Sequence, residues 1–248
     1  ALNDLYSYKG VGKNFLFRMK YGQMEKKEIL EHDPLLNMIP NNHLTCSHIP
    51  ETFLDGSRTM FSTIRNPVDR YISLFKFRWW SKYPHCGLDK AKAHFTNFPD
   101  LSMNQFMELM NELEAPALAG ADKVNADIGF LSLQFIKFFS RTPTKTLAEI
   151  GGHEVYTKEN LNLYPVEFLH TENLNTELAN LLQRLGYNKE LVNPIVSKKP
   201  VRPREVDETT KKDSDPAMDL SVISEYVMKK EKLLYDLFPE YVGPTVEN

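Results

Sequence analysis

The residues best suited to chemistry in this sequence lie in the segment 61–75, where an aromatic and β-branched run ends at Arg65. A guanidinium binds phosphate through two parallel hydrogen bonds, and the start of a helix favours a nearby anion. Ser73 follows about two helical turns later, so its hydroxyl reaches a phosphate only if a nucleotide lies along the helix. Arg65 and Ser73 together therefore predict a phosphate-binding site.

A strand followed directly by a helix is expected to position this pair. Residues 59–64 are mostly of types favoured in strands. Asn66 is a good N-cap, Pro67 suits the first helical position, and Asp69 places negative charge in the first turn. The apolar face of the predicted helix contains Tyr71, Leu74, Phe75 and Trp79. The aromatics Phe75, Phe77, Trp79 and Trp80 are expected in the core, with the wall of an acceptor cleft as the alternative.

The rest of the chain repeats this order of strand and helix. We expect further strands at 5–8, 43–48 and 166–169, helices at 103–113, 128–139, 174–185 and 220–237, and a loop at 81–99. Ser102 and Gln105 form a capping-box pattern at the start of the helix 103–113, and Gly186 is expected to end the helix 174–185. Strands that each pass into a helix pair in parallel through right-handed crossovers. The predicted fold class is α/β, with a central parallel sheet flanked by helices, in one domain over 1–248 with a mobile loop at 197–216.

The segment Arg65-Asn66-Pro67-Val68-Asp69-Arg70-Tyr71-Ile72-Ser73 resembles the 3′-phosphate-binding segment of sulfotransferases that use 3′-phosphoadenosine 5′-phosphosulfate (PAPS). That family reads Arg-(Asp/Asn)-Pro-x-x-Arg-x-x-Ser at this place, and the match is complete. The resemblance implies a P-loop-like sulfotransferase fold in which Arg65 and Ser73 bind the 3′-phosphate of the donor. Arg70 is expected in a salt bridge on the helix surface.

A glycine-rich segment, Lys9-Gly10-Val11-Gly12-Lys13-Asn14, follows the first predicted strand and resembles that family's loop for the 5′-phosphosulfate. Lys9 and Gly12 match the family, whereas Lys13 and Asn14 replace its small hydroxyl residues. The resemblance implies that the backbone amides from Gly10 to Asn14 hold the phosphosulfate and that Lys9 stabilises the departing bridging oxygen. A plain surface turn is the alternative.

The pair Ser47-His48 lies on a predicted strand before the phosphate-binding strand. Carbohydrate sulfotransferases, such as those acting on heparan sulfate, carry a similar pair whose histidine is the catalytic base. The resemblance assigns that role to His48, and an imidazole suits it because it titrates near neutral pH. A hydrogen-bonded structural histidine is the alternative, with His43, His32 and Glu51 as substitutes for the base.

Three later segments carry weaker signals. Ser197 and Lys198 open a basic stretch that falls where the family has a loop closing over the donor, although a solvated charged loop fits equally. Residues 168–174 are expected to serve structure rather than catalysis. The charges at 229–232 predict a solvated helix face.

The predicted activity is transfer of a sulfuryl group from PAPS to the hydroxyl of a carbohydrate or small-molecule acceptor. The product of the donor is 3′-phosphoadenosine 5′-phosphate (PAP), and no metal is required. One alternative is a catalytically inactive sulfotransferase-like module that binds a nucleotide or glycan; another is a P-loop nucleotide kinase. The kinase motif requires Gly at Ser7 and a Mg²⁺-binding Ser or Thr at Asn14, so both positions count against it.

The composition limits partners and location. A net charge of −3 over 248 residues gives no general attraction to polyanions, so we expect no nucleic-acid partner and only local cation sites. Cys46 and Cys86 could form one disulfide or none. The sequence lacks both a long apolar run and a signal-peptide pattern, which predicts a soluble cytoplasmic chain without a membrane partner. The Golgi lumen fits instead if an N-terminal anchor has been removed.

Overall fold

The computed structural model describes residues 46, 59–120, 128–150, 155–198 and 219–242. The chain divides into two compact units, residues 1–64 with 164–200 and residues 65–163 with 201–248. The prediction of one domain over 1–248 stays a prediction. In the part of the chain that the structure describes, no helix is long and apolar enough to cross a membrane.

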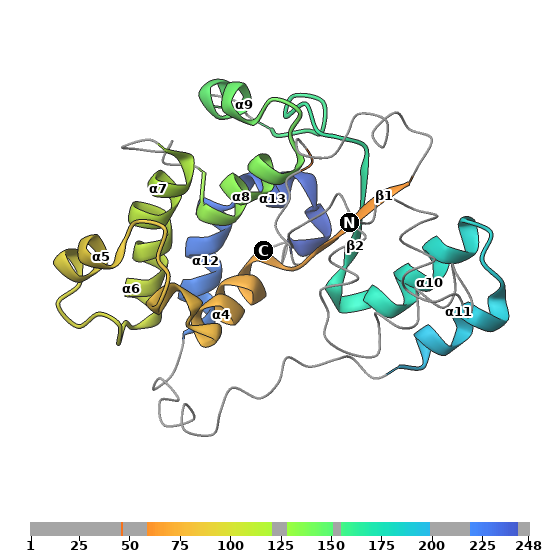
Figure 1. Cartoon of the computed structure of the whole chain (residues 1–248), viewed down its shortest axis with the longest axis horizontal. Helices are drawn as coiled ribbons and strands as arrows, with labels where there is room; N and C mark the ends of the chain where they lie inside the picture. Colours follow the sequence, from red (N-terminus) through yellow and green to blue (C-terminus); the bar gives the residue numbers. More distant parts are fainter. Residues whose placement is uncertain (1–45, 47–58, 121–127, 151–154, 199–218, 243–248) are drawn as a thin grey trace, which may run out of the picture. The chain divides into compact units, whose positions relative to one another are not determined.

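The first unit contains a small parallel sheet. Strand β1 (Met60–Ile64) pairs with β2 (Val166–His170), from Met60 opposite Val166 to Ile64 opposite His170 (Figure 1). Both strands and their parallel pairing confirm the prediction. The described fold is thus mixed helix and strand and compatible with the α/β class, while two strands do not establish a central sheet. Cys46 falls in the predicted strand 43–48 but has 3₁₀ rather than extended backbone.

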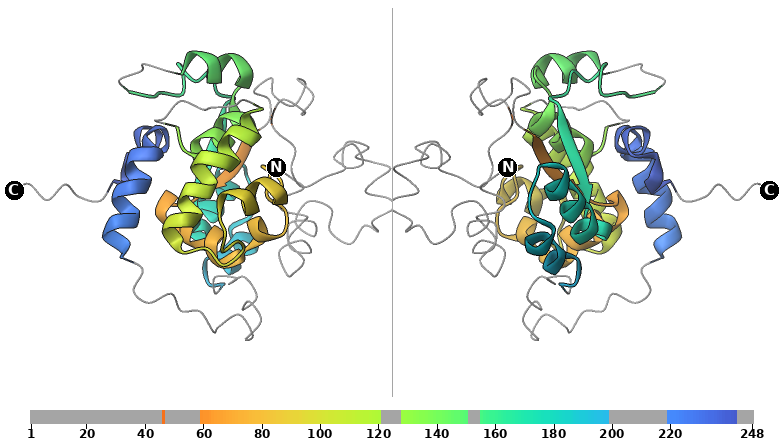
Figure 2. Two further views of the ribbon diagram at one scale, coloured as in Figure 1. Left: turned by 90° about the vertical axis from the view of Figure 1, so that its left-hand side faces the viewer. Right: turned by 90° about the vertical axis from the view of Figure 1, so that its right-hand side faces the viewer.

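Two helices pack together after β2 (Figure 2). A 3₁₀ turn, η6 (Thr171–Asn173), leads into α10 (Leu174–Arg184), and α11 (Lys189–Val196) follows. Gly186 adopts φ +85° where the chain leaves α10, as its predicted role as a helix terminator requires. The helix α11 contains Pro194. Its place is fixed by a shared core of Ala179, Leu182, Val192 and Ile195.

The second unit begins with α4 (Pro67–Phe77), whose start is the one predicted. The Asn66 side chain accepts the Val68 N–H at 2.9 Å, Pro67 is at the helix start, and Asp69 is in the first turn. Tyr71 is fully buried. The predicted apolar face was too long, however, because α4 ends at Phe77 and Trp79 lies beyond it in η4 (Trp79–Ser81), 46% exposed.

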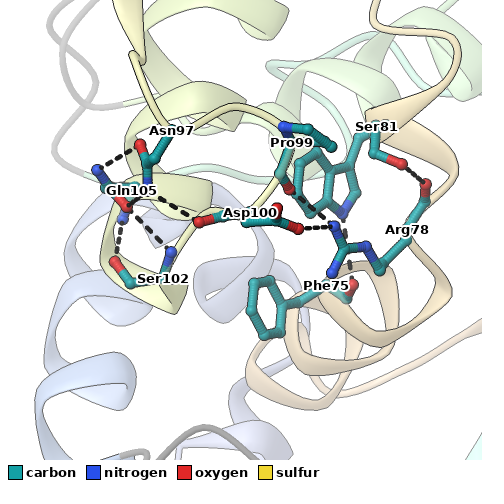
Figure 3. A network of polar contacts seen from close by, with 9 residues as sticks. Phe75, Arg78, Ser81, Asn97, Pro99, Asp100, Ser102 and Gln105 are labelled. Carbon is teal, nitrogen blue, oxygen red and sulfur yellow. Dashed lines mark hydrogen bonds and ion pairs between the residues drawn. The ribbon is translucent and has the colours of Figure 1, made fainter. Parts of the chain in front are cut away.

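Arg78 ends α4 and ties it to a distant loop. Its backbone has φ 50°, and its guanidinium donates to Pro99 O and Asp100 Oδ1, each at 2.9 Å (Figure 3). Phe77 is 65% exposed while Trp80 is buried, so the core prediction for these aromatics is right for Trp80 and wrong for Phe77 and Trp79.

The segment 81–99 was predicted to be a loop, but it contains the helix α5 (Leu88–His94). Only Ala91 and Phe95, four residues apart, are buried there. A buried stripe this narrow among lysines is too weak to read as helical periodicity.

The capping box predicted at Ser102 is present. Ser102 Oγ accepts the Gln105 N–H, and Gln105 Oε1 accepts the Ser102 N–H at 3.0 Å (Figure 3). The helical path runs beyond the predicted end through three consecutive segments, α6 (Met103–Glu108), the π-helix η5 (Leu109–Glu114) and α7 (Ala115–Ala119). The wider π turns come just before Pro116, which has no N–H to continue an α ladder.

The remaining helices come from two stretches of the chain. They are α8 (Phe130–Phe139), α9 (Pro143–Glu149), α12 (Leu220–Lys230), α13 (Lys232–Leu237) and η8 (Pro239–Tyr241). The helix predicted at 220–237 is therefore two helices, broken at Glu231. Glu231 is fully buried, so the prediction of a solvated face is wrong at this residue.

The buried Glu231 carboxylate lies at this break and accepts four hydrogen bonds. Oε1 accepts the Tyr71 hydroxyl at 2.7 Å and the Leu131 N–H at 3.0 Å. Oε2 accepts the N–H and the hydroxyl of Ser132, at 2.7 and 2.6 Å. Because the first turn of α8 has unpaired N–H groups, the carboxylate caps that helix from another part of the chain.

Replacing Gly129 with alanine should destabilise this arrangement. A Cβ at Gly129 would lie 2.2 Å from Glu231 Oε1 and 2.5 Å from its Cδ, so the carboxylate must move and lose hydrogen bonds in a site closed to water. We expect the free energy of unfolding, measured by urea titration, to fall by about 2–3 kcal/mol.

Gly120→Ala is the control for a general cost of losing glycine. No atom lies within 4 Å of its added Cβ, but φ is +69°, which costs about 1 kcal/mol. Equal losses in the two variants would contradict a specific role for the close approach of Gly129 to Glu231.

Candidate functional site

Arg65 and Ser73, the predicted phosphate ligands, both lie in the second unit. Arg65 follows the last residue of β1 directly, and Ser73 lies on α4 with its residue half-buried. Arg70 is three residues before Ser73, a spacing that makes neighbours on a helix surface. Arg65, Arg70 and Ser73 are called the α4 cationic face below.

The two guanidinium groups of this face lie close enough to repel each other. Desolvation and, second, the positive charge of Arg65 lower the pKa of Arg70. Two cations held together in this way favour binding of an anion, which removes their repulsion.

Within the described residues, no carboxylate forms an ion pair with Arg65 or Arg70. The expected surface salt bridge of Arg70 is therefore not found there. Arg78, at the other end of the same helix, shows the contrast because it pairs with Asp100 at 2.9 Å. Among the described residues, Arg65 and Arg70 at the start of α4 thus lack the carboxylate partner that Arg78 has at its end.

The backbone at the start of α4 offers little to an anion. Pro67 has no N–H, Asn66 Oδ1 accepts the Val68 N–H, and the Arg70 N–H bonds to Asn66 O at 2.9 Å. Asp69 adds an exposed carboxylate in the same turn. An anion bound here must therefore be held by side chains, which gives the guanidinium groups and the Ser73 hydroxyl the main part in recognition.

Most of the other predicted site residues lie outside the described residues. These are Lys9, Gly10, Val11, Gly12, Lys13, Asn14 and His48. The roles assigned to them stay predictions.

The start of the late basic segment is described and is well ordered by local bonds. Ser197 Oγ donates to Pro194 O at 3.2 Å, and Asn175 Nδ2 of α10 donates to Lys198 O at 2.7 Å. Ser197 and Lys198 belong to the first unit and directly follow the last residue of α11. Residues 199–216 of the predicted mobile loop lie outside the described part.

A histidine–carboxylate pair at the end of β2 is a feature that sequence reasoning missed. His170 Nδ1 lies 3.0 Å from Glu177 Oε1, and the His170 backbone N–H donates to Glu177 Oε2 at 2.6 Å. The second bond ties the strand end to α10, in keeping with the structural role expected for 168–174. The first fixes the orientation of the imidazole, as carboxylates do for histidine bases in enzymes. The signal in the sequence is faint, since seven residues separate the two side chains.

The two cysteines and the potential metal ligands were considered as further sites of chemistry among the described residues. Cys46 and Cys86 are free thiols, so no disulfide joins them. Burial raises the pKa of Cys46 to about 11, and burial with the hydrogen bond and charge of Glu114 raises that of Cys86 to about 12. Both thiols are therefore protonated, and weak nucleophiles, at neutral pH. No group of three or more potential metal-ligating His, Cys, Asp or Glu side chains occurs among the described residues.

Known proteins add no further constraint on the site. No family model, curated protein or solved structure matches this chain. Any functional conclusion therefore depends on the α4 cationic face and on the sequence pattern around it.

Proposed function

We propose that this protein is a PAPS-dependent sulfotransferase. The observation that carries the proposal is the α4 cationic face, in which Arg65 and Ser73 occupy both phosphate-binding positions of the family pattern. The absence of a carboxylate partner for Arg65 within the described residues supports a role in binding an anion rather than in a surface ion pair. The parallel strands β1 and β2, each leading into a helix, support a P-loop-like fold with a larger central sheet.

The reaction is an in-line displacement at sulfur. An acceptor hydroxyl oxygen forms the new S–O bond while the bond from sulfur to the bridging oxygen of PAPS breaks and PAP leaves. The acceptor proton passes to His48. Lys9 stabilises the charge that develops on the bridging oxygen, and the amides from Gly10 to Asn14 hold the phosphosulfate.

Recognition of the donor depends on its 3′-phosphate. Arg65 supplies two parallel N–H donors, and Ser73 adds a hydroxyl on the same phosphate. By resemblance to the family, Ser197 and Lys198 begin a basic segment that contacts the donor. The acceptor is a carbohydrate or a small molecule with a free hydroxyl.

The proposal predicts that PAP binds far more tightly than AMP, which lacks the 3′-phosphate. Loss of a hydrogen bond to a charged group costs about 1.5–3 kcal/mol, so calorimetry should show a preference of roughly ten- to a hundredfold. Arg65→Ala should abolish the preference, and Ser73→Ala should reduce it.

Arg78→Ala is the matched control, because it removes an arginine from the end of the same helix that is already paired with Asp100. It should leave the ratio of PAP to AMP affinity unchanged. Equal affinity of the wild-type protein for PAP and AMP would refute the proposed function. A clear preference without transfer of radiolabel from PAPS to any acceptor would instead favour the inactive binding module.

A histidine base predicts that turnover rises with pH. The base acts only when neutral, so the rate of label transfer from PAPS should increase through a pKa near the ordinary histidine value of about 6.5. His48→Ala should lose this rise and roughly a hundred- to ten-thousandfold in rate while still binding PAP.

His43→Ala controls for the loss of a nearby histidine and should keep both the rate and the pH profile. If His48→Ala keeps the pH profile, His48 is not the base. His32 and Glu51 are then the next residues to replace, followed by His170, which Glu177 orients.

A further inference from the structure

The side of α4 opposite the cationic face makes polar contacts in the core through the Tyr71 hydroxyl. Tyr71 is fully buried, and its hydroxyl donates to Glu231 Oε1 at 2.7 Å, with Asn111 Oδ1 at 3.1 Å. The Tyr71 ring also meets Phe106 edge-on, with centroids 6.3 Å apart. Packing of the rings alone restrains the helix loosely, whereas the short hydrogen bond specifies one position of the tyrosine.

The Glu231 carboxylate is held by donors from the backbone and the core. Leu131 and Ser132 contribute two N–H groups at the first turn of α8, and the Ser132 hydroxyl adds a third bond. Gly129, whose N–H bonds to Lys230 O at 2.6 Å, leaves no free space beside the carboxylate. Glu231 thus joins α4 to α8 from the break between α12 and α13.

A neutral amide at this position could not accept all four of these hydrogen bonds. Burial raises the pKa of Glu231, while the hydrogen bonds from Ser132 and Tyr71 act in the opposite direction. An amide would turn an NH₂ group toward donors, and the Leu131 and Ser132 N–H groups have no lone pair to accept from it. Two acceptor oxygens are required at this position.

Helix geometry connects this contact to the cationic face. At 100° per residue, Ser73 projects about 200° around the axis from Tyr71, so the two lie on nearly opposite sides of α4. A side-chain atom about 5 Å from the axis moves by about 1 Å when the helix rotates by 10°. A shift of that size takes the Ser73 hydroxyl out of hydrogen-bond range of a phosphate that Arg65 holds.

We propose that Glu231 is a positioning residue for the phosphate site, setting the rotation of α4 through its bond to Tyr71. The C-terminal helices then form part of the donor-binding machinery without touching the donor. This inference rests on the proposed function, because it concerns recognition of the 3′-phosphate by the α4 cationic face.

The test compares Tyr71→Phe with Ser132→Ala. Each variant removes one hydroxyl donor from the same carboxylate and keeps the fold-defining ring or backbone contacts, but only Tyr71 belongs to α4. Both should lower the melting temperature. Calorimetry with PAP and AMP should show the ratio of their affinities falling about tenfold in Tyr71→Phe and staying within about twofold of wild type in Ser132→Ala.

The possible outcomes separate the two claims. If Tyr71→Phe keeps the wild-type ratio, or if both variants lose it equally, Glu231 only stabilises the fold and the inference is overturned. If the wild-type protein itself does not prefer PAP over AMP, the proposed function fails first.

Discussion

The buried carboxylate of Glu231 is the interaction on which the second unit depends. A charge removed from water is tolerated only when its lone pairs are filled, and here four bonds from three residues fill them. That requirement brings the Tyr71 hydroxyl and the first turn of α8 to the carboxylate, and the close approach of Gly129 leaves no room there for a Cβ. Helices far apart in the sequence are thereby held in one arrangement.

The α4 cationic face differs from Glu231 in that its charges lack a partner of opposite sign among the described residues. Glu231 is surrounded by donors, whereas Arg65 and Arg70 lie close together with no carboxylate paired to either within the described residues. Like charges left in proximity cost stability, and a folded protein retains such an arrangement where a ligand completes it. One helix thus carries a satisfied polar contact on its buried side and an unsatisfied charge on its exposed side.

Patterns of neighbouring residues predict much of the secondary structure but few of the side-chain contacts between residues far apart in the sequence. The start of α4 at Asn66-Pro67 and the capping box at Ser102 are decided by neighbours within one turn, and both are confirmed. In the sequence, Glu231 is one charge in an alternating run. Its burial could not be predicted because its donors come from the distant residues 71, 131 and 132. The His170 and Glu177 pair was likewise hidden, because an imidazole–carboxylate contact depends on how a strand turns into a helix. Arg65 and Ser73 stay a predicted phosphate site, which the sequence offers because a single strand-to-helix segment supplies both residues.

Phosphorus NMR of PAP titrated with the protein tests the central claim most directly, because the two phosphate signals are observed separately. With the wild-type protein, the account predicts that the 3′-phosphate signal shifts or broadens on binding. In Arg65→Ala the 3′-phosphate signal should stay at its free position while the 5′-phosphate signal still responds. A 3′-phosphate signal that is unchanged in the wild-type protein, or that responds equally in Arg65→Ala, would contradict recognition of that phosphate by the α4 cationic face.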